Sequence, residues 1–101
     1  MTLDHLTTAI PRHLREVDLR LARVQEDRED QLNATPPNTS DPATTTYRGN
    51  LEATLRDVRI ARERVAAGDY GTCRRCRGVI AEERLEFRPW ALTCAPCANN
   101  E

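Results

Sequence analysis

Four cysteines lie close together near the end of the chain, in the stretch YGTCRRCRGVIAEERLEFRPWALTCAPC of residues 70–97. Cys73 and Cys76 form one C-x-x-C pair, and Cys94 and Cys97 form a second pair after seventeen intervening residues. A C-x-x-C turn presents two sulfur atoms to one ion, and the intervening segment is long enough to return as a short hairpin or loop. The pattern therefore predicts one structural zinc ion bound by four thiolates.

Two other interpretations of these cysteines stay open, a pair of disulfides and a redox-active pair. The N-terminal residues contain no continuous apolar run of the kind that a signal peptide or a membrane helix needs. We therefore expect a cytoplasmic, reducing location, where closely spaced cysteines are more often metal ligands than disulfides. Arg74, Arg75 and Arg77 would help to hold the thiols deprotonated, which suits metal binding and thiol reactivity alike.

The cysteines define a C-terminal module of residues 69–101. Segments shorter than roughly 40 residues seldom fold without a disulfide, a metal ion or a partner. The large apolar residues of the module are few: Tyr70, Val79, Ile80, Leu85, Phe87, Trp90 and Leu92. A bound zinc ion would supply the missing stability, and four sulfur ligands would leave no open position for catalysis.

Residues 1–68 have the pattern of a helical hairpin. Apolar residues recur with heptad-like spacing through the first thirty residues, which predicts one apolar stripe along a helix. The stripe consists of Leu3, Leu6, Ile10, Leu14, Val17, Leu21 and Val24. Because Pro11 is tolerated best in a first turn, we expect this helix over about residues 8–33.

A polar segment with two adjacent prolines follows, and residues 34–44 are expected to form the tip of the hairpin. Asp41 is placed as an N-cap and Pro42 as the first residue of a second helix, expected over residues 42–67. Gly68 is placed to end this helix in a left-handed cap. The apolar seam of the second helix is predicted to be Leu51, Val58 and Val65, helped by Tyr47, Leu55 and Ala61.

Two helices of similar length that are joined by a short turn lie antiparallel. The predicted fold class is therefore mainly α, an antiparallel two-helix coiled-coil hairpin with a small C-terminal four-cysteine zinc finger. Charged residues make up 31% of the chain and aromatic residues 4%, which suits long helices with a narrow apolar seam. We expect Arg59, Arg62 and Arg64 to form a solvated helix face paired with Asp57 and Glu63.

The sequence does not indicate an enzymatic function. His5 and His13 lie far along the chain from the cysteines, and no nucleophile–base pair, glycine-rich phosphate loop or open metal site is evident. The net charge of −1 provides no general basic field for coating DNA, so neither sequence-specific DNA binding nor a membrane partner is expected. A zinc-ribbon module that binds nucleic acid or protein is one hypothesis for this chain. Its basic residues would be Arg74, Arg75, Arg77, Arg84 and Arg88.

The motifs YGTCRRC, Ile80, Arg84-Leu85-Glu86, Arg88-Pro89 and the closing cysteine pair resemble the DksA/TraR family of bacterial transcription regulators, especially its small TraR-like members. The resemblance is most specific over residues 69–97 and weaker over the second helix. It implies a non-catalytic protein, expected to be a monomer, that binds RNA polymerase. In such proteins the hairpin enters the β′ secondary channel, its acidic tip lies near the catalytic magnesium ions, and some members act together with the alarmone ppGpp.

The tip motif of that family is D-x-x-D-x-A, and this chain departs from it. Asp41 matches the first acid, but Thr44 stands in place of the second and Thr46 in place of the alanine. The resemblance implies that Asp41, Pro42 and Thr44 are the tip residues that meet the polymerase. With one carboxylate the electrostatic effect should be smaller, so docking at the channel rim is an alternative, as is a plain N-cap role for Asp41.

Overall fold

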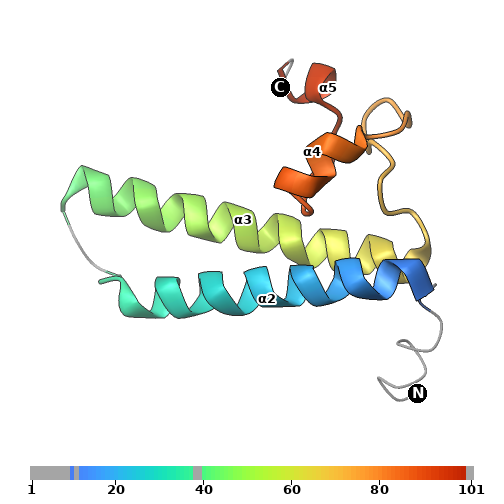
Figure 1. Ribbon diagram of the computed structural model, residues 1–101. Coiled ribbons are helices and arrows are strands. Elements are labelled where there is room, and N and C mark those ends of the chain that lie inside the picture. The colour runs from blue at the N-terminus through green and yellow to red at the C-terminus, as the bar shows by residue number, and fades with distance from the viewer. Residues whose placement is uncertain (1–9, 11, 38–39, 100–101) are drawn as a thin grey trace.

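The computed structural model describes residues 10, 12–37 and 40–99. Over these residues its helices are α2 (Arg12–Ala34), α3 (Pro42–Ala67), α4 (Glu82–Phe87) and α5 (Ala95–Asn99). Figure 1 shows α2 and α3 running antiparallel side by side, with α4 and α5 above α3 in that view. The fold is thus mainly α, a helical hairpin that carries a small four-cysteine module. The predicted helix start near residue 8 lies outside the described residues, as do Leu3 and Leu6 of the stripe.

The apolar stripe of α2 faces α3. Leu21 is fully buried, and Leu14, Val17 and Val24 are partly buried against the same cluster. The end of the helix at Ala34 is closed by Thr35, whose N–H donates to the carbonyl of Leu32 (3.2 Å) and whose hydroxyl donates to that of Gln31 (2.7 Å). No helix within the described part of the chain is long and apolar enough to cross a membrane.

Both ends of α3 carry the caps that the sequence predicts. Asp41 is the N-cap, since its side chain accepts a hydrogen bond from the N–H of Thr44, and Pro42 occupies the first turn. Gly68 ends the helix with φ of 83°, and its N–H donates to the carbonyls of Arg64 and Val65. Glycine adopts this left-handed conformation without a steric penalty, which is why it suits the position.

The predicted seam of α3 is buried at five of its six positions: Leu51, Leu55, Val58, Ala61 and Val65. Tyr47 is the exception, and its prediction as a seam residue is wrong, because its side chain is 45% exposed. The phenol hydroxyl donates to the side-chain oxygen of Gln31 on α2, 2.9 Å away. A polar link across the hairpin therefore takes the place of an apolar contact near the tip.

The expectation of a solvated arginine face on α3 is wrong for Arg62 and Arg64. Arg62 reaches across the hairpin, where its Nε lies 3.0 Å from Oδ1 of Asp18 and its Nη1 lies 3.0 Å from Oε1 of Gln25. Arg64 donates to the backbone carbonyls of Asp69 and Thr72 beyond the end of α3. A guanidinium group has five N–H donors, so one side chain can join two neighbouring segments.

The C-terminal module folds back over the hairpin and shares its core. Leu92 is buried in one cluster with Leu21, Val58, Ala61 and Val65, and Tyr70 and Trp90 pack partly buried against that cluster, as the contacts of the described residues show. Tyr70 also donates from its hydroxyl to the carbonyl of Pro89 (2.9 Å). Arg20 of α2 donates to the carbonyl of Glu86 in α4 (3.0 Å). Hairpin and module are therefore expected to stabilise each other.

Replacing Leu21 by alanine is predicted to lower the free energy of unfolding by about 2–5 kcal/mol, because a fully buried leucine leaves a cavity. Leu19→Ala on the same helix is the matched control, since Leu19 is 59% exposed, and its effect should stay within about 0.5 kcal/mol. Urea unfolding followed by circular dichroism, with zinc present, measures both. Equal losses in the two variants would contradict the assigned apolar seam.

Candidate metal centre

The first cysteine pair lies in a tight turn closed by two backbone hydrogen bonds. The N–H of Cys73 donates to the carbonyl of Gly78, and the N–H of Ile80 donates to that of Gly71, each over 2.8 Å. The turn between them brings Cys76 back beside Cys73, where the Cys76 N–H points to the Cys73 sulfur at 3.5 Å. This short hairpin is the first half of the site.

The second pair lies at the start of α5. Cys94 directly precedes the helix, and Cys97 lies within it. Two bonds tie this half to the first: the N–H of Arg74 donates to the carbonyl of Leu92 (2.9 Å), and Nη1 of Arg75 donates to that of Cys97 (3.3 Å). Segments about twenty residues apart in the chain thereby face each other.

The sulfur atoms of all four cysteines lie within 4.8 Å of one another, and those of Cys76 and Cys94 are 3.8 Å apart. Four sulfurs held about 2.3 Å from one ion at tetrahedral angles lie about 3.8 Å apart. Disulfide sulfurs lie about 2.0 Å apart, and the cysteines are free. The arrangement fits a tetrahedral thiolate site, and of the alternatives weighed from the sequence it favours metal binding over disulfides.

Backbone N–H groups stabilise negative charge on the sulfurs. The pKa of Cys73 is lowered to about 5, chiefly by the N–H of Cys76. The pKa of Cys97 is raised to about 12, chiefly by its hydrogen bond with the side chain of Cys94. Zinc binds cysteine as the thiolate, so binding of the ion would release the protons that the four thiols carry.

The turn after Cys76 contains a backbone conformation that is unusual for its residue. Arg77 has φ of 67°, in the left-handed region, whereas Gly78 does not. A left-handed conformation costs a non-glycine residue about 1–2 kcal/mol. Gly78 meets a different requirement, because a Cβ there would lie 3.3 Å from the sulfur of Cys76. The left-handed position of this turn is therefore occupied by Arg77 and not by the glycine that follows it.

The predicted tip residues lie at the other end of α3 from its junction with the module (Figure 1). Asp41 and Pro42 are exposed and Thr44 is half-buried. Oδ2 of Asp41 accepts from the N–H of Thr44 (3.3 Å) and from its hydroxyl (2.7 Å). The hydroxyl is the main reason that the pKa of Asp41 lies below its ordinary value of 3.8. Thr44 thus donates hydrogen bonds to the single carboxylate of the tip motif and does not provide a second carboxylate.

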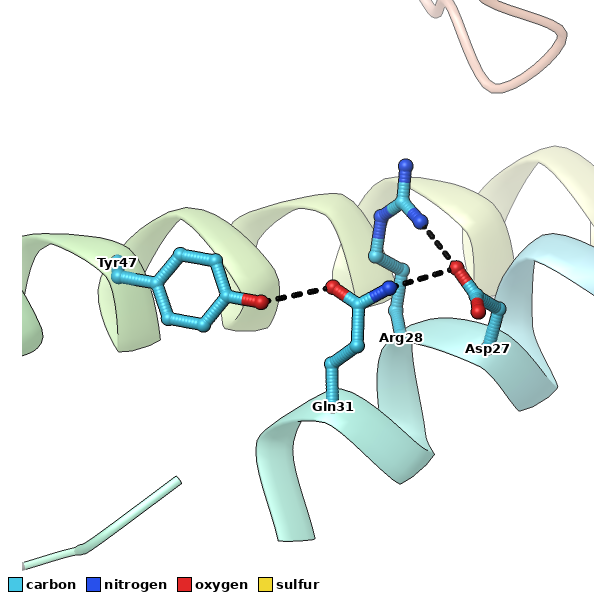
Figure 2. A network of polar contacts seen from close by, with 4 residues as sticks. All are labelled: Asp27, Arg28, Gln31 and Tyr47. Carbon is cyan, nitrogen blue, oxygen red and sulfur yellow. Dashed lines mark hydrogen bonds and ion pairs between the residues drawn. The ribbon is translucent and has the colours of Figure 1, made fainter. Parts of the chain in front are cut away.

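A polar network near the tip joins the two long helices (Figure 2). The hydroxyl of Tyr47 donates to Oε1 of Gln31 (2.9 Å), and Nε2 of Gln31 donates to Oδ2 of Asp27 (2.8 Å). Arg28 forms an ion pair with the same oxygen of Asp27. The network fixes the last turns of α2 against the first turns of α3.

Arg48 closes the end of α2 from the opposite helix. Its Nη1 donates to the carbonyls of Leu32 (3.1 Å) and Thr35 (2.8 Å). The last turn of α2 contains no basic residue of its own. Positive charge near a helix C-terminus is favourable, so Arg48 supplies from α3 what α2 lacks. The sequence interpretation missed this role, although the missing basic residue was a visible signal.

A cleft of about 290 Å³ lies between α3 and the C-terminal module. Its charged lining consists of Asp57 from α3 and three arginines, Arg74, Arg84 and Arg88. Trp90 forms part of the wall. The sequence did not predict this cleft, because its two walls come together only through tertiary packing.

The chain is similar to one described family and to two known proteins. Residues 68–100 match the family described as prokaryotic dksA/traR C4-type zinc finger. The chain is 48% identical to an uncharacterized protein of Aquifex aeolicus (strain VF5) over 50 residues. The matched stretch covers 48% of this chain and 34% of that protein. The chain thus spans about a third of the curated relative that it matches. The structure of transcription factor DksA2 from Pseudomonas aeruginosa aligns with a TM-score of 0.47 and 25% identity, over 96% of this chain and 80% of that one.

The four clustered sulfurs define the module as a four-cysteine zinc finger with one structural zinc ion. More narrowly, residues 68–100 match the DksA/TraR type of C4 zinc finger.

Replacing Arg77 by glycine is predicted to raise the zinc affinity about fivefold, equivalent to about 1 kcal/mol, because glycine relieves the left-handed strain. Arg77→Ala is the control, since alanine keeps the strain but lacks the guanidinium group. Competition with a chromophoric chelator measures the affinity. A gain in the alanine variant as large as in the glycine variant would attribute the effect to charge and contradict the strain.

Thr44→Val is predicted to raise the pKa of Asp41 toward 3.8, because the hydroxyl is the largest cause of its lowering. A lowered folded-state pKa means that ionised Asp41 stabilises the cap above about pH 3.8, and that this contribution is lost as the pH falls through the folded-state value. NMR titration of the carboxyl group measures the shift. Thr46→Val is the control, and an equal shift there would contradict the assigned bond.

Proposed function

We propose that the chain is a non-catalytic regulator of bacterial transcription that binds RNA polymerase in the cytoplasm. The observation that carries the proposal is a DksA/TraR-type C4 zinc finger packed on the base of an antiparallel helical hairpin. Cys73, Cys76, Cys94 and Cys97 are proposed as the ligands of its structural zinc ion, whose four thiolates leave no position for a substrate.

The two parts of the chain have different proposed tasks. The hairpin, residues 1–68, enters the secondary channel of the polymerase or rests at its rim. The module, residues 69–101, holds the base of the hairpin in a fixed orientation through the shared core around Leu92. With 26 residues at about 1.5 Å each, α3 extends roughly 39 Å, which gives the tip a reach well beyond the module.

With one carboxylate, the tip would act more weakly at the active centre of RNA polymerase than a tip with two carboxylates. The pKa of Asp41 lies below its ordinary value of 3.8, so the side chain is a carboxylate at neutral pH, but its Oδ2 is engaged by Thr44. A carboxylate that already caps a helix has less capacity for a distant magnesium site. We therefore propose docking in or at the channel, with the contribution of Asp41 to output as the quantity to be measured.

The cleft beside α3 is the proposed place for ppGpp, the alarmone that the family resemblance implies for some members. Arg74, Arg84 and Arg88 can form bidentate bonds with phosphate oxygens, and Trp90 offers an aromatic face. Asp57 in the same cleft reduces its positive charge. The ligand would thus be held between the module and the hairpin.

The proposal predicts that purified bacterial RNA polymerase binds the full chain at micromolar concentration in low salt, with about one zinc per chain in the complex. Polymerase pull-down, with metal analysis of the same sample, measures both. Lack of binding with zinc in place would refute a polymerase partner. A salt-sensitive shift of nucleic acid without polymerase binding would instead favour the nucleic-acid alternative.

The variant Asp41→Asn distinguishes action at the polymerase active centre from docking at the channel rim. Asparagine also caps helices but carries no charge. Action at the active centre predicts a changed transcription output with unchanged affinity. Docking at the rim predicts that output and affinity both stay as in the wild type. The same assay with and without ppGpp reports whether the alarmone contributes.

A further inference from the structure

One aromatic side chain of the chain stands apart from the others. The aromatic residues are Tyr47, Tyr70, Phe87 and Trp90. Both tyrosines place their hydroxyls in hydrogen bonds within the fold, and Trp90 packs against the core. Phe87 has no polar atom to solvate, yet its side chain is 85% exposed. An apolar side chain of this size would contribute favourable free energy if a partner buried it.

Phe87 lies at the edge of a shallow groove between α4 and the start of α5. The groove measures about 300 Å³, and its lining consists of Glu83, Arg84, Phe87, Arg88 and Ala95. Ala95 lies next to Cys94, so the groove borders the zinc centre, and it shares Arg84 and Arg88 with the cleft beside α3. Its surface is hollow enough to receive one large side chain.

The groove is held in place on both sides. On the hairpin side, Arg20 donates to the carbonyl of Glu86, the residue before Phe87 (3.0 Å). On the module side, Nε of Arg84 donates to the carbonyl of Thr93 (2.9 Å). Because α4 is anchored through its neighbours, Phe87 is presented by a fixed backbone. A preorganised apolar group loses less entropy on binding than a mobile one.

The charges around the groove indicate the chemistry of its occupant. Two guanidinium groups and one carboxylate line it, which leaves one excess positive charge. Arg88 is exposed at the rim, where it can form a bidentate pair with a carboxylate. The carboxylate of Glu83 and the apolar surface of Phe87 suit a phosphate backbone poorly. The surface fits an apolar side chain with an acidic neighbour.

We propose that this groove is a docking surface for a protein segment that presents a large apolar side chain next to a carboxylate. The inference rests on the proposed function, because the segment is assigned to RNA polymerase. Phe87 then becomes buried on binding and Arg88 pairs with the acidic residue. Such a contact anchors the module while the hairpin stays available to the channel. Aromatic and arginine residues in central positions commonly dominate the energy of an interface.

The module offers a matched control for Phe87. Val79 is 87% exposed, but it lies in the turn after the first cysteine pair and does not line the groove. Both side chains make little contact within the fold, so replacing either by alanine should leave the thermal unfolding midpoint and the zinc content unchanged. Any difference in binding between the two variants then reports on the groove itself.

The test measures the Kd of purified RNA polymerase for the full zinc-loaded wild type, Phe87→Ala and Val79→Ala, without ppGpp. We expect Phe87→Ala to weaken binding at least tenfold and Val79→Ala to change it less than twofold. Arg88→Gln should weaken binding and make the remaining affinity less sensitive to salt. Unfolding midpoints and zinc content are recorded for each protein.

The outcomes separate the two levels of the proposal. Wild-type binding that Phe87→Ala leaves intact would overturn the docking groove and leave the polymerase partner standing. No binding by the wild type would overturn the polymerase partner itself. Sedimentation of the free proteins completes the test. Self-association of the wild type that Phe87→Ala abolishes would make a second copy the occupant, and the proposed one would be wrong.

Discussion

The sharing of one zinc ion by four thiolates is the constraint on which the rest of the structure depends. The helices of the module have only six and five residues, and over its described part an isolated bridge between Thr72 and Val79 is the only strand pairing. Elements this short do not persist on their own. The metal joins the two cysteine turns, so the segment between them must return to the hairpin and deliver Leu92 to its core.

Features that depend on neighbouring residues were predictable from the sequence. Asp41 and Gly68 cap α3. Both caps were predictable because an acid before proline is typical of a helix start, and a glycine after an apolar stripe is typical of a helix end. The spacing of the cysteines likewise indicated the metal centre. These signals are local because the physical requirement, a capped end or a two-sulfur turn, is satisfied within a few residues.

Features that depend on two segments meeting were not predictable in the same way. The periodicity placed Tyr47 in the apolar seam, but the reach of its hydroxyl to Gln31 decides its position. Arg62 has carboxylates on its own helix and bonds instead to Asp18 of α2. The groove at Phe87 and the arginine cleft arise only where the module lies back over the hairpin, and the direction of that fold-back is set by tertiary packing.

Arginine closes most of the junctions between segments. Backbone carbonyl groups accept from Arg20, Arg48, Arg64, Arg75 and Arg84. All fifteen basic side chains of the chain are arginine. A guanidinium group presents several N–H donors in a rigid plane, which suits it to bridging carbonyl groups of different segments. The side chains also contain no primary amine, so acetylation or ubiquitin attachment at lysine cannot act on this sequence. Covalent control at side chains would have to use other groups, such as thiols, hydroxyls or the guanidinium groups themselves.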